Sequence, residues 1–213
     1  MFAPEGRRIL IPLLICAFTA GILAHHFQWL WLTILYFVLG LLFLFSLNFF
    51  RDPTRRIPKD PKIVISPADG KVVKYEEVDD PEVGAGATLV SIFLNVFNVH
   101  VNRVPVTGKI QTRVHQQGKF LAAFNHAASD KNERVITVLE NEIGRFKIRQ
   151  IAGLLARRIL CYAEPGKTMQ RGERLGYIMF GSRTDLVLPK GINVEITLGQ
   201  KVIGNETIIA RLP

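Results

Sequence analysis

Two long apolar runs occupy the first fifty residues of the chain, and short runs of alternating apolar and polar residues follow them. The apolar runs span residues 9–24 and 29–50, and a short break that contains His25, His26 and Gln28 separates them. A helix that crosses a membrane needs about 20 mainly apolar residues, which both runs reach if the two histidines lie at the interface. Residues 1–50 are therefore predicted to form a membrane anchor of two helices in a hairpin.

Basic residues flank this hairpin at both ends. Arg7 and Arg8 precede the first run, and Arg51, Arg55 and Arg56 follow the second. Because cytoplasmic flanks carry an excess of Lys and Arg, both ends of the hairpin are expected in the cytoplasm. The rest of the chain is then expected on the cytoplasmic side of the cell (inner) membrane. A secretory signal peptide is the alternative, but the second apolar run and the lack of a clear small-x-small cleavage site argue against it.

Residues 51–62 combine basic side chains with Pro53, Pro58 and Pro61, which predicts a linker without regular structure. The cytoplasmic leaflet is negative and attracts basic residues close to the membrane. This linker could therefore contact an anionic membrane, or it could be a solvated segment that only fixes topology. Its basic members are Arg51, Arg55, Arg56, Lys59 and Lys62.

From residue 63 to residue 213, short runs rich in Val and Ile alternate with Gly and Pro, a pattern typical of strands. One further segment, 153–163, fits either a helix or the entry to a strand. The prediction is a mainly β soluble domain of many short strands. The predicted strands are 62–66, 71–75, 88–94, 104–114, 134–140, 145–151, 175–180, 186–188, 193–197 and 207–210.

A weak internal repeat refines the predicted fold. Residues 83–89 and 169–175 share the pattern apolar-x-x-Gly-x-x-Leu, and a looser copy covers 202–208. A turn whose Gly tolerates positive φ, followed by a strand, explains this pattern. Such units, and the segment SPADGKV (66–72), occur in barrel-sandwich folds of the lipoyl and biotinyl kind. We therefore expect a barrel-sandwich-like domain, in which some α+β detail is possible.

Composition narrows the expected partners. The net charge is +9, but no aromatic–basic stacking pattern supports nucleic-acid binding, so the basic surface is better matched by a bilayer. The two cysteines, Cys16 and Cys161, lie in an apolar run and in a β-type segment, with no disulfide or metal-ligand spacing. We expect neither a disulfide nor a bound metal.

Three polar segments interrupt the apolar pattern of the soluble part. In the first, 66–71, Asp69 precedes a glycine and would ordinarily cap a turn. In the second, 95–105, alternation places Asn98, His100 and Asn102 on one face of an extended segment. A polar face with a central histidine is unusual for a plain β core, although a lone His is more often structural.

The third segment, 180–185, carries a Gly-Ser pair at Gly181 and Ser182. The glycine allows a sharp bend and leaves its own carbonyl unobstructed, so Ser182 Oγ could attack that carbonyl if a base takes its proton. An ordinary β-turn is the alternative. The segment is not a hydrolase Gly-x-Ser-x-Gly elbow, because no second glycine follows and no helix is predicted.

Taken in order, these segments resemble the phosphatidylserine decarboxylase proenzymes, in particular their short bacterial and archaeal form. The resemblance covers residues 51–213, and a membrane-embedded N-terminus also fits it. The residues that carry it are RDPTR (51–55), SPADGKV (66–72), NVHVNRVP (98–105), the Asn-Glu-Arg of KNERV (131–135) and FGSR (180–183).

The resemblance implies self-cleavage by an Asp–His–Ser set, which matches Asp69, His100 and Ser182 here. His100 would take the proton of Ser182, and Asp69 would orient the histidine. Cleavage between Gly181 and Ser182 would give a large chain, 1–181, and a small chain, 182–213, that remain associated. Ser182 would become a pyruvoyl group.

The resemblance also implies the reaction. The pyruvoyl group would form a Schiff base with the amine of phosphatidylserine and accept the electron pair left by CO2, with no separate cofactor. The product would be phosphatidylethanolamine, in phospholipid biosynthesis. Candidate headgroup contacts are Arg183, His115, Lys119 and Phe120, and the alternative for Arg183 is a surface charge beside the cut.

The chain departs from the longer family members at two places. They have LGST where this chain has FGSR, and they carry two histidines where it has only His100, with Arg103 opposite the other. It therefore stays open whether His100 is the base for cleavage, the acid–base group for decarboxylation, or both. Two other functions are a membrane-tethered, non-enzymatic barrel-sandwich module for binding or carrying, and the same chemistry on an archaeal ether-linked serine lipid.

Overall fold

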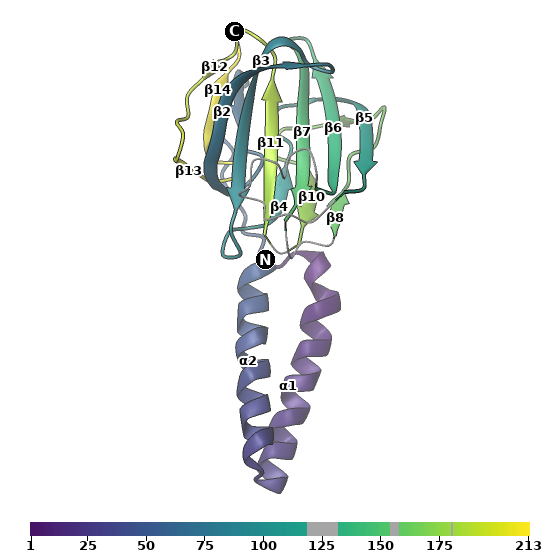
Figure 1. The fold of residues 1–213 in the computed structure, drawn as a ribbon, viewed down its shortest axis with the longest axis vertical. Coiled ribbons are helices and arrows are strands. Elements are labelled where there is room, and N and C mark those ends of the chain that lie inside the picture. Colours follow the sequence, from purple (N-terminus) through teal and green to yellow (C-terminus); the bar gives the residue numbers. More distant parts are fainter. Residues whose placement is uncertain (119–131, 154–157, 180) are drawn as a thin grey trace. The chain divides into compact units, whose positions relative to one another are not determined.

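The computed structural model describes residues 1–118, 132–153, 158–179 and 181–213 (Figure 1). Two compact units make up the chain, Met1–Thr54 and Arg55–Pro213. The first unit is helical and the second is built from strands, so the predicted fold class, a mainly β domain after a helical hairpin, is confirmed.

The N-terminal unit contains a short 3-10 turn, η1 (Pro4–Gly6), and two helices, α1 (Arg7–Phe27) and α2 (Leu30–Phe49). Gln28 ends α1 in the left-handed conformation, with φ 52°, and its N–H donates to Ala24 O at 2.9 Å. The two helices pack against each other, and both are apolar and long enough to cross a membrane. Their length and composition are consistent with membrane association, as the apolar pattern predicted.

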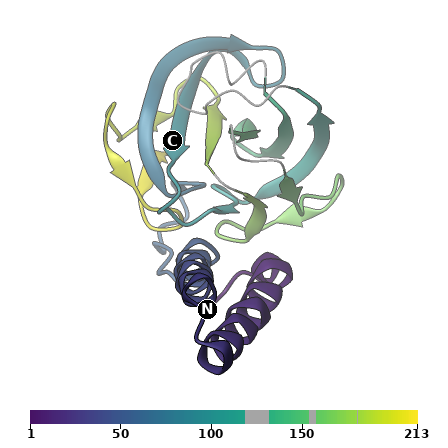
Figure 2. The ribbon, with the colours of Figure 1, turned by 60° about the horizontal axis from the view of Figure 1, so that its bottom comes forward.

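Within the described residues of the second unit, fourteen strands form three antiparallel sheets. The largest sheet has the order β13-β2-β3-β11-β7-β6-β5-β9, and Figure 2 shows it curling around its interior as a half-barrel. The two smaller sheets have the orders β1-β14-β12 and β4-β10-β8. The strands are β1 (Ile63–Ile65), β2 (Gly70–Asp80), β3 (Gly84–Leu94), β4 (Val101–Arg103), β5 (Gly108–Gln116), β6 (Arg134–Asn141), β7 (Gly144–Ala152), β8 (Ile159–Cys161), β9 (Thr168–Met169), β10 (Arg174–Ile178), β11 (Ser182–Leu188), β12 (Asn193–Val194), β13 (Lys201–Val202) and β14 (Ile208–Arg211).

Strand β11 lies in the middle of the large sheet, between β3 and β7. Successive side chains of a strand point to opposite faces. Leu186 and Leu188 therefore share one face of β11, and both belong to the main hydrophobic core together with Ile92 and Leu94 of β3. Ser182 and Thr184 lie on the same face of β11 as Leu186, because every second residue of a strand shares a face. Ser182 is therefore the first residue of the inward-facing row of a central strand.

The left-handed glycine of the repeat is present in two of the three predicted copies, although Gly86 lies inside β3 and only Gly172 lies in a turn before its strand. Gly86 has φ 68° and Gly172 has φ 87°, the left-handed conformation that the repeat predicted for its glycines. A side chain at Gly172 would also collide with Ile57, whose Cδ1 lies 2.1 Å from the position of the added Cβ. In the third copy the left-handed residue is Asn205, with φ 68°, and not Gly204.

Hydrogen bonds from Arg171 hold the backbone of the segment before β1. Arg171 donates from its guanidinium to Pro58 O at 3.0 Å, Asp60 O at 2.5 Å and Ile63 O at 3.2 Å. Residues 52–60 contain neither helix nor strand. The Lys59, Asp60, Pro61 and Lys62 residues are nevertheless exposed, so a solvated linker and a membrane contact both stay open for residues 51–62. In the ambiguous segment 153–163, β8 occupies Ile159–Cys161 as a strand, and 154–157 lie outside the described residues.

A nearly buried ion pair ties the β2–β3 hairpin to β7. Lys147 Nζ lies 2.9 Å from Asp80 Oδ2 and also pairs with Glu82; the Lys147 and Asp80 side chains are 7% and 9% exposed. Burial by itself raises the pKa of Asp80. The hydrogen bond and charge of Lys147, with the amides of Glu82 and Val83, outweigh burial and hold this pKa below its ordinary value.

We expect Lys147→Met to lower the free energy of unfolding by about 1–3 kcal/mol at pH 7, because it leaves a buried carboxylate without its cation. The folded pKa of Asp80 is depressed, so the pair stabilises the fold above the unfolded value of about 3.9, and this contribution is lost as the pH falls through the folded pKa. The difference between variant and wild type should therefore shrink below about pH 4. Thermal unfolding of the full chain in detergent, followed by circular dichroism, measures it.

The matched control is Arg145→Met, which removes an exposed ion pair with Glu140. It should change stability by less than about 1 kcal/mol. Equal losses in the two variants would contradict the importance of the buried pair.

Candidate active site

Ser182 is the first residue of β11, and its neighbours across the sheet are Leu94 of β3 and Ala152 of β7. The residue is fully buried, and its Oγ has no hydrogen-bond partner among the residues that the structure describes. A buried hydroxyl without a partner costs free energy that a structural serine would not ordinarily carry. The buried hydroxyl of Ser182 is therefore better explained by a chemical role than by a structural one.

Gly181 precedes this serine in the left-handed conformation, with φ 71°. A Cβ built on Gly181 would meet no described atom within 4 Å, so the constraint on this residue is backbone conformation and not space. The chain thus bends sharply immediately before Ser182. Phe180, which precedes Gly181 in the predicted FGSR segment, lies outside the described residues.

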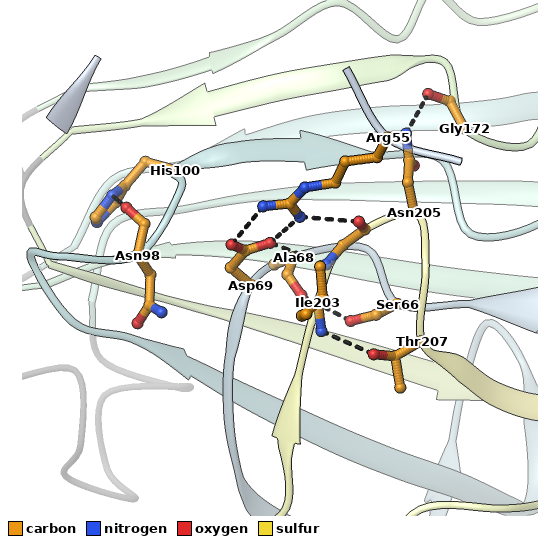
Figure 3. Close-up of polar contacts among 11 residues, drawn as sticks. Arg55, Ser66, Ala68, Asp69, Asn98, His100, Gly172, Ile203, Asn205 and Thr207 are labelled. Carbon is orange, nitrogen blue, oxygen red and sulfur yellow. Dashed lines mark hydrogen bonds and ion pairs between the residues drawn. The ribbon is translucent and has the colours of Figure 1, made fainter. Parts of the chain in front are cut away.

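His100 lies immediately before β4 and is fully buried. Its Nδ1 is 2.9 Å from the carbonyl oxygen of Asn98, as Figure 3 shows. A carbonyl oxygen can only accept, so in the neutral ring Nδ1 carries the proton and Nε2 carries the lone pair. This hydrogen bond selects the tautomer in which Nε2 can act as a base.

Two layers of contacts relate His100 to Ser182. In the first, the Ile178 N–H donates to His100 O at 3.3 Å, and the Ile178 side chain packs on Ala152, the register partner of Ser182. In the second, Asn102 contacts Thr184, two residues further along both segments. His100 is thus linked to Ser182 through Ile178 and Ala152, and Asn102 contacts Thr184 directly. Because both residue numbers increase by two from the first layer to the second, we infer that β4 and β11 run in the same direction. His100 then lies in the layer of Ser182.

The second layer is a buried polar network that the sequence pattern did not assign to the site. Asn102 Nδ2 donates to Thr184 Oγ1 at 3.2 Å, and Gln150 Nε2 donates to Asn102 Oδ1 at 2.8 Å. Gly176 makes room for it, because an added Cβ would lie 2.7 Å from Gln150 Nε2 and 2.0 Å from the Leu160 carbonyl oxygen. The available signal was a polar residue, Gln150, in the row of alternate β7 residues that is otherwise apolar, namely Phe146, Ile148 and Ala152.

Asp69 is engaged by a different partner from the one predicted. Arg55 donates to both carboxylate oxygens, at 2.7 Å for Nη2 and Oδ2, and the Gly204 N–H donates to Oδ1 at 2.9 Å (Figure 3). Within the described residues, the Asp69 carboxylate makes no hydrogen bond to His100. The structure therefore does not join these two members of the predicted set, and the orienting role of Asp69 remains a prediction.

Arg183 is fully buried, so it is not a surface charge beside the cut. Its Nε donates to Asp185 Oδ1 at 2.7 Å and its Nη2 to Ser91 Oγ at 2.6 Å. Arg149 completes the cluster, 3.3 Å from Asp185 Oδ2. Alternation along β11 puts Arg183 on the opposite face from Ser182. The cluster therefore anchors Arg183, the second residue after the predicted cut, while a headgroup contact remains a prediction.

The other headgroup candidates are not brought to Ser182 by the described residues. His115 lies on β5, which β6 and β7 separate from β11, and its Nε2 is 3.0 Å from Glu133 Oε1. Lys119 and Phe120 lie outside the described residues. Over the described part of the chain, no group of three His, Cys, Asp or Glu side chains is arranged to hold a metal ion.

Comparison with known proteins identifies the family of this chain. The sequence model of the family described as phosphatidylserine decarboxylase matches residues 42–210. A phosphatidylserine decarboxylase proenzyme of Cupriavidus pinatubonensis is 43% identical over 94% of this chain and 92% of its own length. Proenzymes with the same description from Aromatoleum aromaticum and Solidesulfovibrio magneticus are 48% and 50% identical, over 81% and 79% of both chains. This chain therefore belongs to the phosphatidylserine decarboxylase family and is a decarboxylase.

Proposed function

We propose that this chain is a proenzyme that cleaves itself between Gly181 and Ser182 and then converts phosphatidylserine to phosphatidylethanolamine and CO2. The observation that carries the proposal is the buried Ser182 Oγ, which has no partner among the described residues and follows a left-handed glycine. His100 lies in the same layer, with its tautomer fixed by Asn98. In this proposal Ser182 is the nucleophile, the Gly181 carbonyl is the group attacked and His100 is the base.

The cleavage chemistry follows from these groups. His100 Nε2 takes the Ser182 Oγ proton, and Oγ attacks the Gly181 carbonyl carbon. The C–N bond breaks and the nitrogen takes up the proton, which leaves an ester between Gly181 and Ser182. Loss of the Ser182 Cα proton then forms the Cα–Cβ double bond and breaks the Cβ–Oγ bond, which releases the Gly181 carboxylate. Water replaces the nitrogen of the resulting dehydroalanine, and ammonia leaves.

The cut chains would stay together because the small chain, 182–213, contributes a central strand. Its β11 pairs with β3 along its whole length and with β7 from Ser182 to Val187, and β14 pairs with β1. Arg183 and Asp185 add buried ion pairs beside the new chain end. These interactions would hold the first residue of the small chain in register after the peptide bond is lost.

The position of Ser182 fits the precursor of a pyruvoyl group. Its side chain has no structural hydrogen bond to lose among the described residues, and the Asn102–Thr184–Gln150 network supplies polar neighbours one layer away. The pyruvoyl group would supply an electron sink for the pair left behind by CO2. His100 would handle the proton that replaces the carboxylate, and His115, Lys119 and Phe120 stay candidates for headgroup contacts.

Membrane attachment is part of the proposal. Helices α1 and α2 would hold the decarboxylase domain, 63–213, at the cytoplasmic side of the inner membrane, where its lipid substrate lies. A carrier function has less support, because it calls for a lysine at a hairpin tip, and Lys71 lies inside β2. Residues 51–62 would join anchor and domain.

Intact mass measurement of the purified full chain tests the proposal. We expect two chains, 1–181 and 182–213, with the small chain lighter by one ammonia than a peptide with a free N-terminal serine. Sequencing from the N-terminus should be blocked on the small chain only. A folded, active preparation that contains one uncut chain would exclude the mechanism.

A further inference from the structure

A rigid turn presents an exposed aromatic side chain between β3 and β4. Phe97 is 65% exposed. Two asparagines brace the turn: the Phe97 N–H donates to Asn95 Oδ1 at 2.9 Å, and the Asn95 N–H donates to Asn98 Oδ1 at 2.9 Å. The Asn98 N–H also donates to Asn95 O at 3.0 Å. The Phe97 side chain is thus largely exposed on a turn whose backbone is held by hydrogen bonds.

This turn adjoins the candidate active site on both of its sides. It begins directly after Leu94, the register partner of Ser182, and Asn98 at its end accepts the hydrogen bond from His100. Phe97 is therefore three residues from Leu94 and adjacent to Asn98. We call the turn, residues 95–98, the Phe97 turn.

Two exposed lysines lie on the strands beside the Phe97 turn. Lys71 of β2 is the register partner both of Phe93 of β3 and of Lys201 of β13. Like charges directly opposite each other in a sheet are unfavourable, and neither lysine forms an ion pair with a residue that the structure describes. An anionic partner from outside the domain would remove this repulsion.

We propose that the Phe97 turn, with Lys71 and Lys201, docks on an anionic lipid bilayer, with the Phe97 ring inserted at the boundary between headgroups and acyl chains. Aromatic side chains with adjacent lysines are the combination that binds membrane interfaces. The inference rests on the proposed function, because docking lets the serine end of the lipid approach Ser182 while its acyl chains stay in the bilayer. Phe97 is then a positioning residue for the substrate.

Fluorescence of the full chain in lipid nanodiscs tests the docking. The chain has only two tryptophans, Trp29 and Trp31, so changing both to Phe gives a silent background for Phe97→Trp. In nanodiscs of phosphatidylcholine with phosphatidylglycerol, we expect blue-shifted emission and at least twofold quenching by brominated acyl chains. Adding Lys71→Glu and Lys201→Glu should reduce the quenching severalfold. Emission typical of water, without quenching, would overturn the proposal.

Ile143→Trp in the same background is the matched control. Ile143 is also exposed, but it lies in the β6–β7 turn, at the opposite end of β7 from Ala152. Eight residues of strand separate the two ends by about 26 Å. Its emission should remain typical of water, and quenching equal to that of Phe97→Trp would show that insertion is not specific to the Phe97 turn and would overturn the proposal.

A kinetic comparison separates docking from the proposed reaction. Phe97→Ser should lower the rate on phosphatidylserine in bilayers about fivefold or more, and lower it much less on a monomeric short-chain phosphatidylserine. Equal losses on both substrates would overturn docking, and thermal unfolding checks that the variant is folded. If Phe97→Trp is quenched but the wild type decarboxylates neither lipid, docking stands and the proposed function fails.

Discussion

Replacing Ser182 by alanine is expected to leave a single uncut chain and to abolish CO2 release, with a loss of at least about 10³-fold. The change removes only Oγ, the proposed nucleophile and the atom lost when the new chain end forms. Ser182 is fully buried within β11, and alanine keeps the backbone pairing with Leu94 and Ala152. Because Oγ has no partner among the described residues, its removal should cost little stability.

Gel electrophoresis and intact mass measure the cut, and release of labelled CO2 from carboxyl-labelled phosphatidylserine measures turnover. Ser91→Ala is the matched control, since Ser91 is also a buried serine of the same sheet and pairs with Asp185. It loses a hydrogen bond to Arg183 but should still be cut. Decarboxylation that survives in Ser182→Ala would place the electron sink elsewhere.

The fold was predictable where alternation or long apolar runs are strong. Helices α1 and α2 lie over the two apolar runs, and the long strands β2, β3, β6 and β7 lie over predicted ones. The prediction failed at 104–114, where one strand was expected. There β4 ends at Arg103 and β5 begins at Gly108, because Pro105 lacks the N–H that a continuous ladder needs. Strands of two or three residues, such as β9 and β13, are too short to show a period.

The site was only partly predictable, for a physical reason. Ser182 and His100 stand out locally, as a Gly-Ser pair and as a histidine on a polar face. The partners of Asp69 do not, because Arg55 and Gly204 reach it from distant parts of the chain. Likewise, the network of Asn102, Thr184 and Gln150 depends on register between strands, which packing of the whole domain fixes. Local sequence names candidate groups, and tertiary structure decides their partners.

Replacing His100 by alanine is expected to slow self-cleavage about 10²–10⁴-fold, the usual contribution of a positioned general base. The hydrogen bond from Nδ1 to Asn98 O leaves Nε2 as the basic nitrogen, and contacts through Ile178 and Ala152 put the residue in the layer of Ser182. In the proposed mechanism, His100 is the group that accepts the proton from Ser182 Oγ. Slow cutting, rather than none, is expected because Ser182 itself remains.

Cell-free synthesis at controlled pH, sampled over time, measures the rate of appearance of the small chain. Protein made in cells accumulates for hours, so even a slow cleavage could reach completion and its reduced rate would not be seen. In the wild type the rate should rise with pH and level off as the imidazole becomes neutral, whereas His100→Ala should lose this plateau. Arg103→Ala is the control, because the family resemblance predicts that Arg103 lies where longer members have a second histidine. Loss of cutting in Arg103→Ala alone would overturn the assignment to His100.

The same variant separates the two roles open to His100. Any His100→Ala protein that has been cut can be assayed for decarboxylation, with turnover divided by the amount of small chain present. If His100 also delivers the proton that replaces the carboxylate, turnover per cut chain should fall by a further factor of about 10²–10⁴. Normal turnover per cut chain would confine His100 to processing. The proton donor for decarboxylation would then be a different group, to be sought among the residues near Ser182.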